Sequence, residues 1–278
     1  MKQLACFVKL LILICLISEA VQVGNVLKPV GVDSSASLPS PRIVGGLIAA
    51  SGQFPYQVSV RVGGRHSCGG AILSQEYIIT AAHCVIRLSW CNLKKFSSLP
   101  TYFVTVNAGS VNSSVDGVVA GVSEIIIHPD FSYTDSDIAL LKLNVSLQFT
   151  DLIKPIALAG VSPPTGAYAT ISGWGRTREG GPLSELLMYN RYVRTLSNDD
   201  CARAIGYKSA GILCLAKSRG NGICGGDQGG PAVYNGVLIG VASYHKLACG
   251  TDEPDGYIRI STYRKWLIDV STADSGVL

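Results

Sequence analysis

Short β-prone runs recur along most of this sequence, and turn-forming residues separate them. The clearest are YQVSVRV at 56–62, EYIITAA at 76–82, YFVTVNA at 102–108, SEIIIHP at 123–129 and GVLIGVASY at 236–244. β-Branched and aromatic residues favour strands, whereas Gly, Pro, Asn and Ser between such runs favour turns. Many short strands with turns between them indicate an all-β sandwich or barrel.

One convincing helix is expected, and it lies near the end of the sequence. Tyr263, Trp266, Leu267 and Val270 recur there at the spacing of one helix face. We expect this apolar face to pack on the β core.

The first twenty residues have the pattern of a secretory signal. Lys2 and Lys9 precede the apolar run 10–17, and small residues follow at positions 18 and 20, which a signal peptidase prefers. A membrane anchor is the alternative, but a bilayer span needs about 20 apolar residues, and this run is shorter. We therefore predict a signal peptide at 1–20 and a secreted, extracellular protein.

The composition changes after the predicted signal. Residues 21–42 are rich in Ser, Pro and Val without a regular period, which predicts a flexible propeptide before a folded domain at 43–278. With 47% hydrophobic and 15% charged residues, the chain has the composition of a globular protein. Its formal charge of +4 comes from scattered basic residues, so we expect no nucleic-acid partner and no polybasic membrane contact.

Cysteine usage fits the oxidising compartment that a signal peptide implies. Of nine cysteines, Cys6 and Cys15 lie in the predicted signal, so seven remain, and an odd number leaves at least one unpaired or bridged to another molecule. No Cys-x-x-Cys pair occurs, and the four histidines are far apart in sequence. No metal site is expected from these spacings.

Three motifs carry the residue types of a nucleophilic triad or the loop that would hold its nucleophile. TAAHC contains His83, DSDIALLKL contains Asp137, and CGGDQGGP contains Gln228. An aspartate that fixes the tautomer of a histidine and stabilises its imidazolium form is the base half of such a triad. Taken singly, a core histidine is the better interpretation of His83 and a turn cap that of Asp137, so the flanking motifs carry the assignment.

The motifs PRIVGG, SCGGAILSQEYIITAAHC, DIALLKL, ISGWG and CGGDQGGP occur in this order from Ile43 onwards. From there to about Val270 the chain resembles the chymotrypsin/trypsin family of secreted serine proteases. The resemblance implies two packed six-stranded antiparallel β-barrels and a C-terminal α-helix. It also implies an active-site cleft between the barrels, to which one barrel brings His83 and Asp137 and the other brings Gln228.

The resemblance also implies the disulfides and the anion site. The implied disulfides are Cys68–Cys84, Cys201–Cys214 and Cys224–Cys249. Cys91 is then left over, as a free thiol or as a bridge to another molecule, including a covalent dimer. The implied oxyanion hole is formed by the backbone N–H groups of Gly226 and Gln228.

An activation switch is implied at the start of the domain. Arg42–Ile43 resembles the family's cleavage site, and after cleavage the Ile43 ammonium would pair with Asp227. The alternative is that PRIVGG persists as an unused relic.

Gln228 stands where the family has its nucleophilic serine. A serine hydroxyl can give its proton to histidine and attack a carbonyl carbon, whereas a carboxamide nitrogen has a delocalised lone pair and its oxygen is a weak nucleophile. Without the nucleophile, about 10³- to 10⁴-fold acceleration over water remains. We therefore expect the chain to be inactive as a protease.

The implied specificity pocket departs from the trypsin pattern. Gly222 occupies the position of the usual aspartate, and Tyr244 that of an aromatic platform. His245 stands where a glycine normally leaves room for substrate. Asp255 stands where the family usually has another glycine in the pocket wall. It either attracts a basic side chain or is a solvated loop carboxylate.

Two surface features complete the predictions. Asn112 and Asn144 begin glycosylation sequons. Ser110 replaces the first acidic ligand of calcium-binding relatives, so no calcium site and no cofactor are expected.

Three functions remain open after this interpretation. The favoured one is a secreted, non-catalytic protease homologue that binds a protease, a substrate, an inhibitor or a receptor. The second is an active endopeptidase, for which Cys91 is the one unusual candidate nucleophile. The third is a structural or storage protein of secretions.

Overall fold

The computed structural model describes residues 44–89 and 92–273. The predicted signal peptide and propeptide, the Arg42–Ile43 site and Cys91 lie outside the described residues. The described residues divide into two units: residues 87–89 and 92–97 belong to one, and residues 44–86 and 98–273 belong to the other. In the stretch 86–98, β5 (Ile86–Ser89) and β6 (Asn92–Ser98) pair in a two-stranded sheet.

The first half of the larger unit is a closed barrel in the strand order β2-β3-β4-β9-β8-β7. Its strands are β2 (Gln57–Val62), β3 (Arg65–Ile72), β4 (Tyr77–Thr80), β7 (Val104–Ala108), β8 (Val118–Ile127) and β9 (Ala139–Leu143). Many of the buried positions carry β-branched residues, among them Val58, Val60 and Val106, which are fully buried. Closure pairs every strand on both sides and removes exposed sheet edges.

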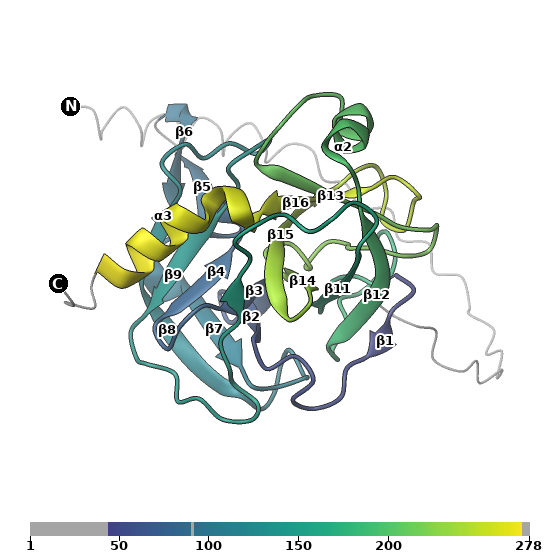
Figure 1. The fold of residues 1–278 in the computed structure, drawn as a ribbon. Helices are drawn as coiled ribbons and strands as arrows, with labels where there is room; N and C mark the ends of the chain where they lie inside the picture. The colour runs from purple at the N-terminus through teal and green to yellow at the C-terminus, as the bar shows by residue number, and fades with distance from the viewer. Residues whose placement is uncertain (1–43, 90–91, 274–278) are drawn as a thin grey trace, which may run out of the picture. The chain divides into compact units, whose positions relative to one another are not determined.

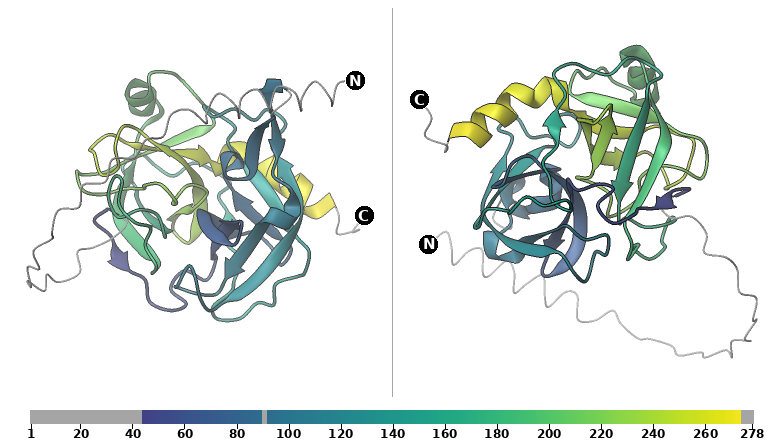
Figure 2. Two further views of the ribbon diagram at one scale, coloured as in Figure 1. Left: turned by 180° about the vertical axis from the view of Figure 1, so that it is seen from behind. Right: turned by 60° about the horizontal axis from the view of Figure 1, so that its bottom comes forward.

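The second half forms another six-stranded ring, β12-β11-β14-β15-β16-β13, in which β13 pairs back with β12. The ring strands are β11 (Tyr168–Gly173), β12 (Met188–Thr195), β13 (Ile212–Ala216), β14 (Pro231–Tyr234), β15 (Val237–His245) and β16 (Asp255–Arg259). Two short strands add to it: β1 (Leu47–Ile48) pairs with β12, and β10 (Ala157–Leu158) pairs with β15. The predicted fold class is confirmed, and Figures 1 and 2 show the two barrels side by side.

The C-terminal helix α3 (Ile260–Ala273) matches the predicted helix. Tyr263 and Leu267 are buried, and Trp266 and Val270 pack against the same core cluster. Seen in Figure 1, α3 lies across the strands as the yellow helix.

The expectation of a single convincing helix was wrong, because α2 (Asn198–Ile205) precedes β13. The Ser197 hydroxyl accepts a hydrogen bond from Asp200 N–H, and Gly206 ends the helix in the left-handed region at φ 90°. Helix N-termini favour such side-chain acceptors, and C-termini favour glycine. The eight-residue helix is too short for the apolar periodicity on which the sequence argument depended.

Three disulfides cross-link the described residues, and they are the three pairs that the family resemblance implies. They are Cys68–Cys84, Cys201–Cys214 and Cys224–Cys249, with Cα–Cα distances of 6.2, 5.4 and 5.2 Å. Within the two described ranges, no helix is long and apolar enough to cross a membrane.

Candidate functional site

The structure brings His83 and Asp137 together, although 54 residues separate them in the sequence. His83 lies in the 3₁₀ helix Ala82–Val85, and Asp137 lies just before β9. His83 Nδ1 lies 2.7 Å from Asp137 Oδ2, and the His83 backbone N–H donates to Asp137 Oδ1 at 2.8 Å. The Ser243 hydroxyl, from β15, donates to Asp137 Oδ2 at 2.6 Å. These contacts hold the imidazole as a proton acceptor is held in a catalytic triad.

Gln228 directs its carboxamide to its own backbone loop. Gln228 Oε1 accepts a hydrogen bond of 2.9 Å from Gly226 N–H, the donor that the family resemblance assigns to the oxyanion hole. The carbonyl of Gln228 accepts from Gly69 N–H at 2.7 Å, which ties the loop to β3 of the first barrel. Among the described residues, no hydrogen bond joins Gln228 to His83. The side chain at the nucleophile position therefore contacts the anion site and not the base.

His66 supports the same loop, and the sequence analysis did not single it out. His66 Nε2 lies 3.0 Å from the Gly226 carbonyl oxygen, and it must donate because a carbonyl oxygen can only accept. In a neutral imidazole the other nitrogen, Nδ1, then accepts a hydrogen bond of 2.8 Å from the Ser59 hydroxyl. Burial lowers the pKa of His66 to about 4; the bond to Gly226 opposes this shift and the Arg61 charge adds to it. At physiological pH, His66 is therefore neutral and links Ser59 in β2 to the Gly226 loop through two hydrogen bonds.

Asp227 is buried beneath the loop. Its carboxylate accepts hydrogen bonds from Gly175 N–H at 2.8 Å and from Cys224 N–H at 3.0 Å. Gly175 has to be a glycine, because a Cβ there would overlap the Asp227 carboxylate. Burial raises the pKa of Asp227 to about 7, the two N–H donors oppose the rise, and Asp255 adds to it.

The predicted partner of Asp227, Ile43, lies outside the described residues. The next residue, Val44, forms an isolated β-bridge with Gly222. The pairing of Ile43 with Asp227 therefore stays a prediction, and the chain that follows the predicted cleavage site runs beside the predicted specificity pocket.

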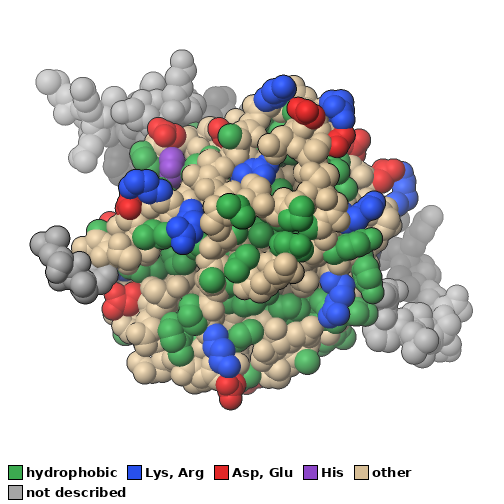
Figure 3. Space-filling model, in the orientation of Figure 1, with side chains coloured by type: hydrophobic (Ala, Val, Ile, Leu, Met, Phe, Trp, Pro, Cys, Tyr) green, Lys and Arg blue, Asp and Glu red, His purple; other side chains and the backbone are tan. Residues whose placement is uncertain are grey.

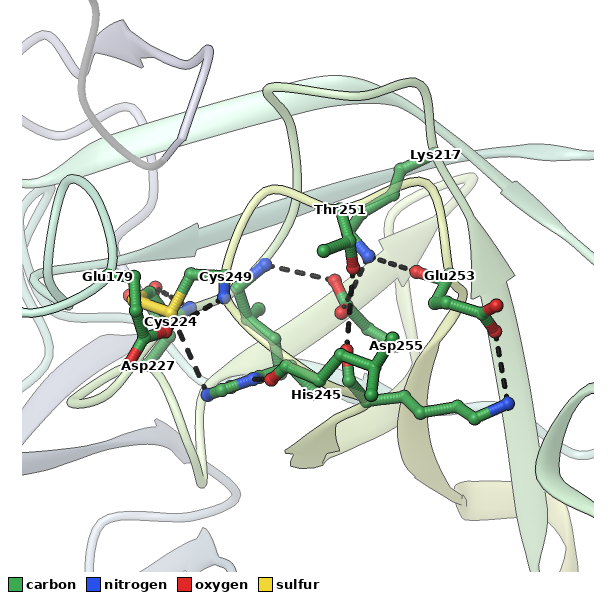
Figure 4. Close-up of polar contacts among 12 residues, drawn as sticks. Glu179, Lys217, Cys224, Asp227, His245, Cys249, Thr251, Glu253 and Asp255 are labelled. Atoms are coloured by element: carbon green, nitrogen blue, oxygen red, sulfur yellow. Dashed lines mark hydrogen bonds and ion pairs between the residues drawn. A yellow bond between two sulfur atoms is a disulfide. The ribbon is translucent and has the colours of Figure 1, made fainter.

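Within that pocket, the interpretation of Asp255 as a solvated loop carboxylate was wrong. The Asp255 side chain is 1% exposed, and Lys217 Nζ lies 2.9 Å from its Oδ1. Its Oδ2 accepts from Ile223 N–H at 3.0 Å. Burial raises the pKa of Asp255, and the Lys217 ammonium opposes that rise. Figure 4 shows Lys217 reaching the Asp255 carboxylate and the Glu253 carbonyl.

Tyr244 and His245 lie at the end of β15, next to the start of β16. His245 is the strand partner of Asp255, and Tyr244 is the partner of Gly256. Both side chains are half-buried. His245 Nδ1 lies 3.0 Å from the Leu247 carbonyl oxygen, so its ring is directed to the adjoining loop.

The remaining predicted sites differ in exposure. Asn144 is exposed. Asn112 is half-buried, and its side-chain oxygen accepts from Ser114 N–H at 2.8 Å and Val115 N–H at 3.2 Å. In the described residues, two groups of side chains have the spacing of a metal site: Cys68, His83 and Cys84, and Glu179, Cys224 and Cys249. The two cysteines of each group form a disulfide with one another, so their sulfurs are not available as thiolate ligands.

Two six-stranded antiparallel barrels with a His–Asp pair and a Gly-rich loop define the chymotrypsin-like serine-protease fold. The family model described as Trypsin matches residues 43–267, and the chain belongs to the trypsin family. "Serine protease SP24D" of Anopheles gambiae is 41% identical over 226 residues, which cover 81% of this chain and 80% of that protein. "Trypsin alpha" of Drosophila melanogaster is 38% identical over 240 residues, which cover 84% and 88%.

Solved structures show the same fold. Mouse neuropsin, titled a serine protease expressed in the limbic system, has a TM-score of 0.72 and 29% identity, and the match covers 81% of this chain and 98% of that one. A structure titled human heparin binding protein has a TM-score of 0.70 and 28% identity, and the match covers 83% and 97%.

Proposed function

We propose that this chain is a proteolytically inactive member of the trypsin family that acts outside the cell as a binding or regulatory protein. Its partners would be a protease, a protease substrate, an inhibitor or a receptor. The observation that carries the proposal is the hydrogen bond from Gly226 N–H to the Gln228 carboxamide oxygen.

That hydrogen bond bears on two steps of acyl transfer. Attack on a carbonyl needs an oxygen that can lose its proton to His83, and the Gln228 carboxamide offers none. Stabilising the tetrahedral intermediate needs free N–H donors for its oxyanion, and removing one such donor costs about 10²- to 10³-fold in rate. Gly226 N–H, one of the two implied donors, is already engaged. Both steps are therefore unfavourable at this site.

An active endopeptidase is the alternative, and the names of the relatives and the His83–Asp137 pair favour it. It would require another nucleophile. Cys91, the candidate from the sequence, lies outside the described residues, and no geometry supports it. A structural or storage protein is the remaining candidate.

Three features support a binding role outside the cell. One structural neighbour carries a binding property in its title, so proteins with this fold include at least one named for binding. The three disulfides suit an oxidising compartment, and the N-terminal sequence favours secretion. On the face in Figure 3, Lys and Arg side chains lie apart among acidic and apolar ones, which favours a protein partner over a polyanion there.

The test is direct. The purified chain, before and after cleavage at Arg42, is incubated with peptide substrates of basic, aromatic and small residues and with a fluorophosphonate probe. We expect no turnover and no labelling. Labelling in the cleft that His83→Ala abolishes would overturn the proposal. A saturable partner captured from the native fluid would distinguish a binder from a storage protein.

A further inference from the structure

Lys217 and Asp255 form a buried ion pair at the base of the predicted specificity pocket. Both side chains are 1% exposed, and Lys217 Nζ lies 2.9 Å from Asp255 Oδ1. The same ammonium donates to the Glu253 carbonyl, and the other Asp255 oxygen accepts from Ile223 N–H. The two charges are thus paired within the chain, although Asp255 Oδ1 lies beside the ammonium without accepting a hydrogen bond from any described residue.

The path of the Lys217 side chain crosses the position that a larger residue at 222 would fill. A Cβ on Gly222 would clash with Cδ and Cε of Lys217 and with Asp255 Oδ2. Gly222 also has φ +107°, which residues with a Cβ rarely adopt. The absence of a side chain at Gly222 therefore makes room for the lysine stem.

The strand arrangement explains how Lys217 reaches this position. Leu215, in β13, is the strand partner of Asp255 in β16, and Lys217 follows two residues later. Ile223, whose N–H fixes the carboxylate, is 2% exposed and packs in the core of the second barrel. The ion pair is therefore held by a barrel strand and by the segment that carries Gly222.

We propose that Lys217 is an internal occupant of the primary specificity pocket, which for that reason accepts no arginine or lysine side chain from another protein. The ammonium takes the place of a basic substrate side chain, and its stem fills the space above Gly222. A partner of the proposed binding function would then engage surfaces outside this pocket. Only the statement about the partner rests on the proposed function. Occupation of the pocket by Lys217 would hold equally for an active and for an inactive chain.

A purely structural ion pair is the competing explanation. It requires that the Lys217–Asp255 pair stabilises the barrel and leaves an open pocket beside it. The two explanations differ in their response to a small cation, because only an occupied pocket gains a binding site when the lysine is shortened.

The experiment measures binding of p-aminobenzamidine, an amidinium whose fluorescence rises in an apolar site. Wild type should show no saturable binding. Lys217→Ala should bind at least tenfold more tightly than wild type, because the space is opened and the Asp255 carboxylate faces the amidinium. Lys217→Ala/Asp255→Asn should lose this gain. Lys217→Met, which removes the charge but keeps the bulk, is the matched control and should remain unable to bind.

Two outcomes of that experiment overturn the inference: saturable binding to wild type that Asp255→Asn removes, or a folded Lys217→Ala that does not bind. The shortened variant leaves a buried carboxylate without its partner and can fail to fold. A second measurement then tests the burial that the inference requires, namely acetylation of the lysines of native wild type, mapped by mass spectrometry. Lys217 should stay unmodified while Lys265, 87% exposed, reacts. Equal reaction rates would refute the inference.

Neither measurement reads hydrolysis. Failure of the occupancy inference therefore leaves the proposed inactivity untouched, and a protease activity that overturned the proposed function would leave the occupancy result standing.

Discussion

At the scale of single residues, the His83–Asp137 pair keeps the geometry of a catalytic base, whereas the side chain at position 228 does not have that of a nucleophile. His83, Asp137 and Ser243 keep hydrogen bonds of 2.6–2.8 Å. The Gln228 side chain is long enough for its carboxamide oxygen to accept a hydrogen bond from Gly226 N–H, two residues earlier. A serine side chain is shorter and would not place its hydroxyl oxygen at the same position. The general base, His83, is therefore positioned for catalysis, while the side chain at the nucleophile position, Gln228, is hydrogen-bonded to the backbone.

This contrast predicts the result of restoring the hydroxyl. Gln228→Ser should react with a fluorophosphonate at least about 100-fold faster than Gln228→Ala, because a positioned general base contributes about 10²- to 10⁴-fold. The probe is chosen because it does not depend on the specificity pocket. Gln228→Ser/His83→Ala should lose the gain. Equal labelling of the serine and alanine variants would mean that the His83–Asp137 pair no longer acts as a base.

The buried Asp227 predicts a pH dependence of stability. Its pKa is raised from 3.8 to about 7 by burial, so the folded chain binds this proton more tightly than the unfolded chain. The contribution of Asp227 to the free energy of unfolding is therefore largest below about pH 4 and falls as the pH rises to 7. Three pKa units correspond to about 4 kcal/mol.

Urea unfolding of the uncleaved chain at several pH values between 4 and 8 checks this prediction. The isosteric variant Asp227→Asn should not show the decline. A difference between wild type and variant that stays constant with pH would show that Asp227 is ionised throughout this range.

At the scale of helices and strands, the sequence pattern located several strands and the C-terminal helix, but it missed other elements, among them β3, β12 and α2. The run YQVSVRV became β2, and the helix face with Tyr263 became α3. The run YFVTVNA was placed too early, because Thr101–Phe103 form a 3₁₀ turn after Pro100 and β7 begins at Val104. Helix α2 had only a Ser-x-x-Asp cap as a signal. Such local signals are too short for a pattern of period two or 3.6 to appear.

The packing of α3 gives a prediction at this scale. Leu267 is fully buried in the core cluster that joins the helix to the barrels. Leu267→Ala should lower the free energy of unfolding by about 2–5 kcal/mol, through lost burial and the cavity left behind. Lys265→Ala on the exposed face of α3 is the control and should stay within about 0.5 kcal/mol of wild type. Chemical unfolding measures both, and similar losses would mean that α3 contributes through its own helicity.

At the scale of the whole molecule, the family resemblance implied the two barrels and the three disulfides, but not the proposed occupant of the pocket. The family resemblance transfers residues that match a motif, and Lys217 matches none. It meets Asp255, 38 residues later, only because β13 and β16 are neighbours in the barrel. His66 was missed for the same reason, since its contact with Gly226 spans 160 residues.

The activation switch is testable on the whole chain. Cleavage after Arg42 should raise the melting temperature of wild type, because a freed Ile43 ammonium would pair with the buried Asp227 carboxylate. Asp227→Asn should be cleaved equally well and gain nothing. If cleaved wild type and cleaved variant melt alike, the ion pair does not form or has no energetic consequence.

Cysteine pairing gives the last prediction. With six cysteines in the three observed disulfides, Cys91 should be a free thiol or an intermolecular bridge. Non-reducing peptide mapping identifies its state. A Cys91 bridge to one of the other six within the same chain would contradict the disulfide pattern of the structure.

The contact between Gly226 N–H and the Gln228 carboxamide also concerns how long such a protein would persist in a fluid that contains protease inhibitors. Many inhibitors of active proteases depend on a covalent adduct with the nucleophile or on an anion held by the loop. On the proposed function, this chain offers no oxygen for the adduct, and one of its two anion donors is engaged by its own side chain. Inhibitors of that kind would be consumed by active relatives and would leave this protein free to bind its partner.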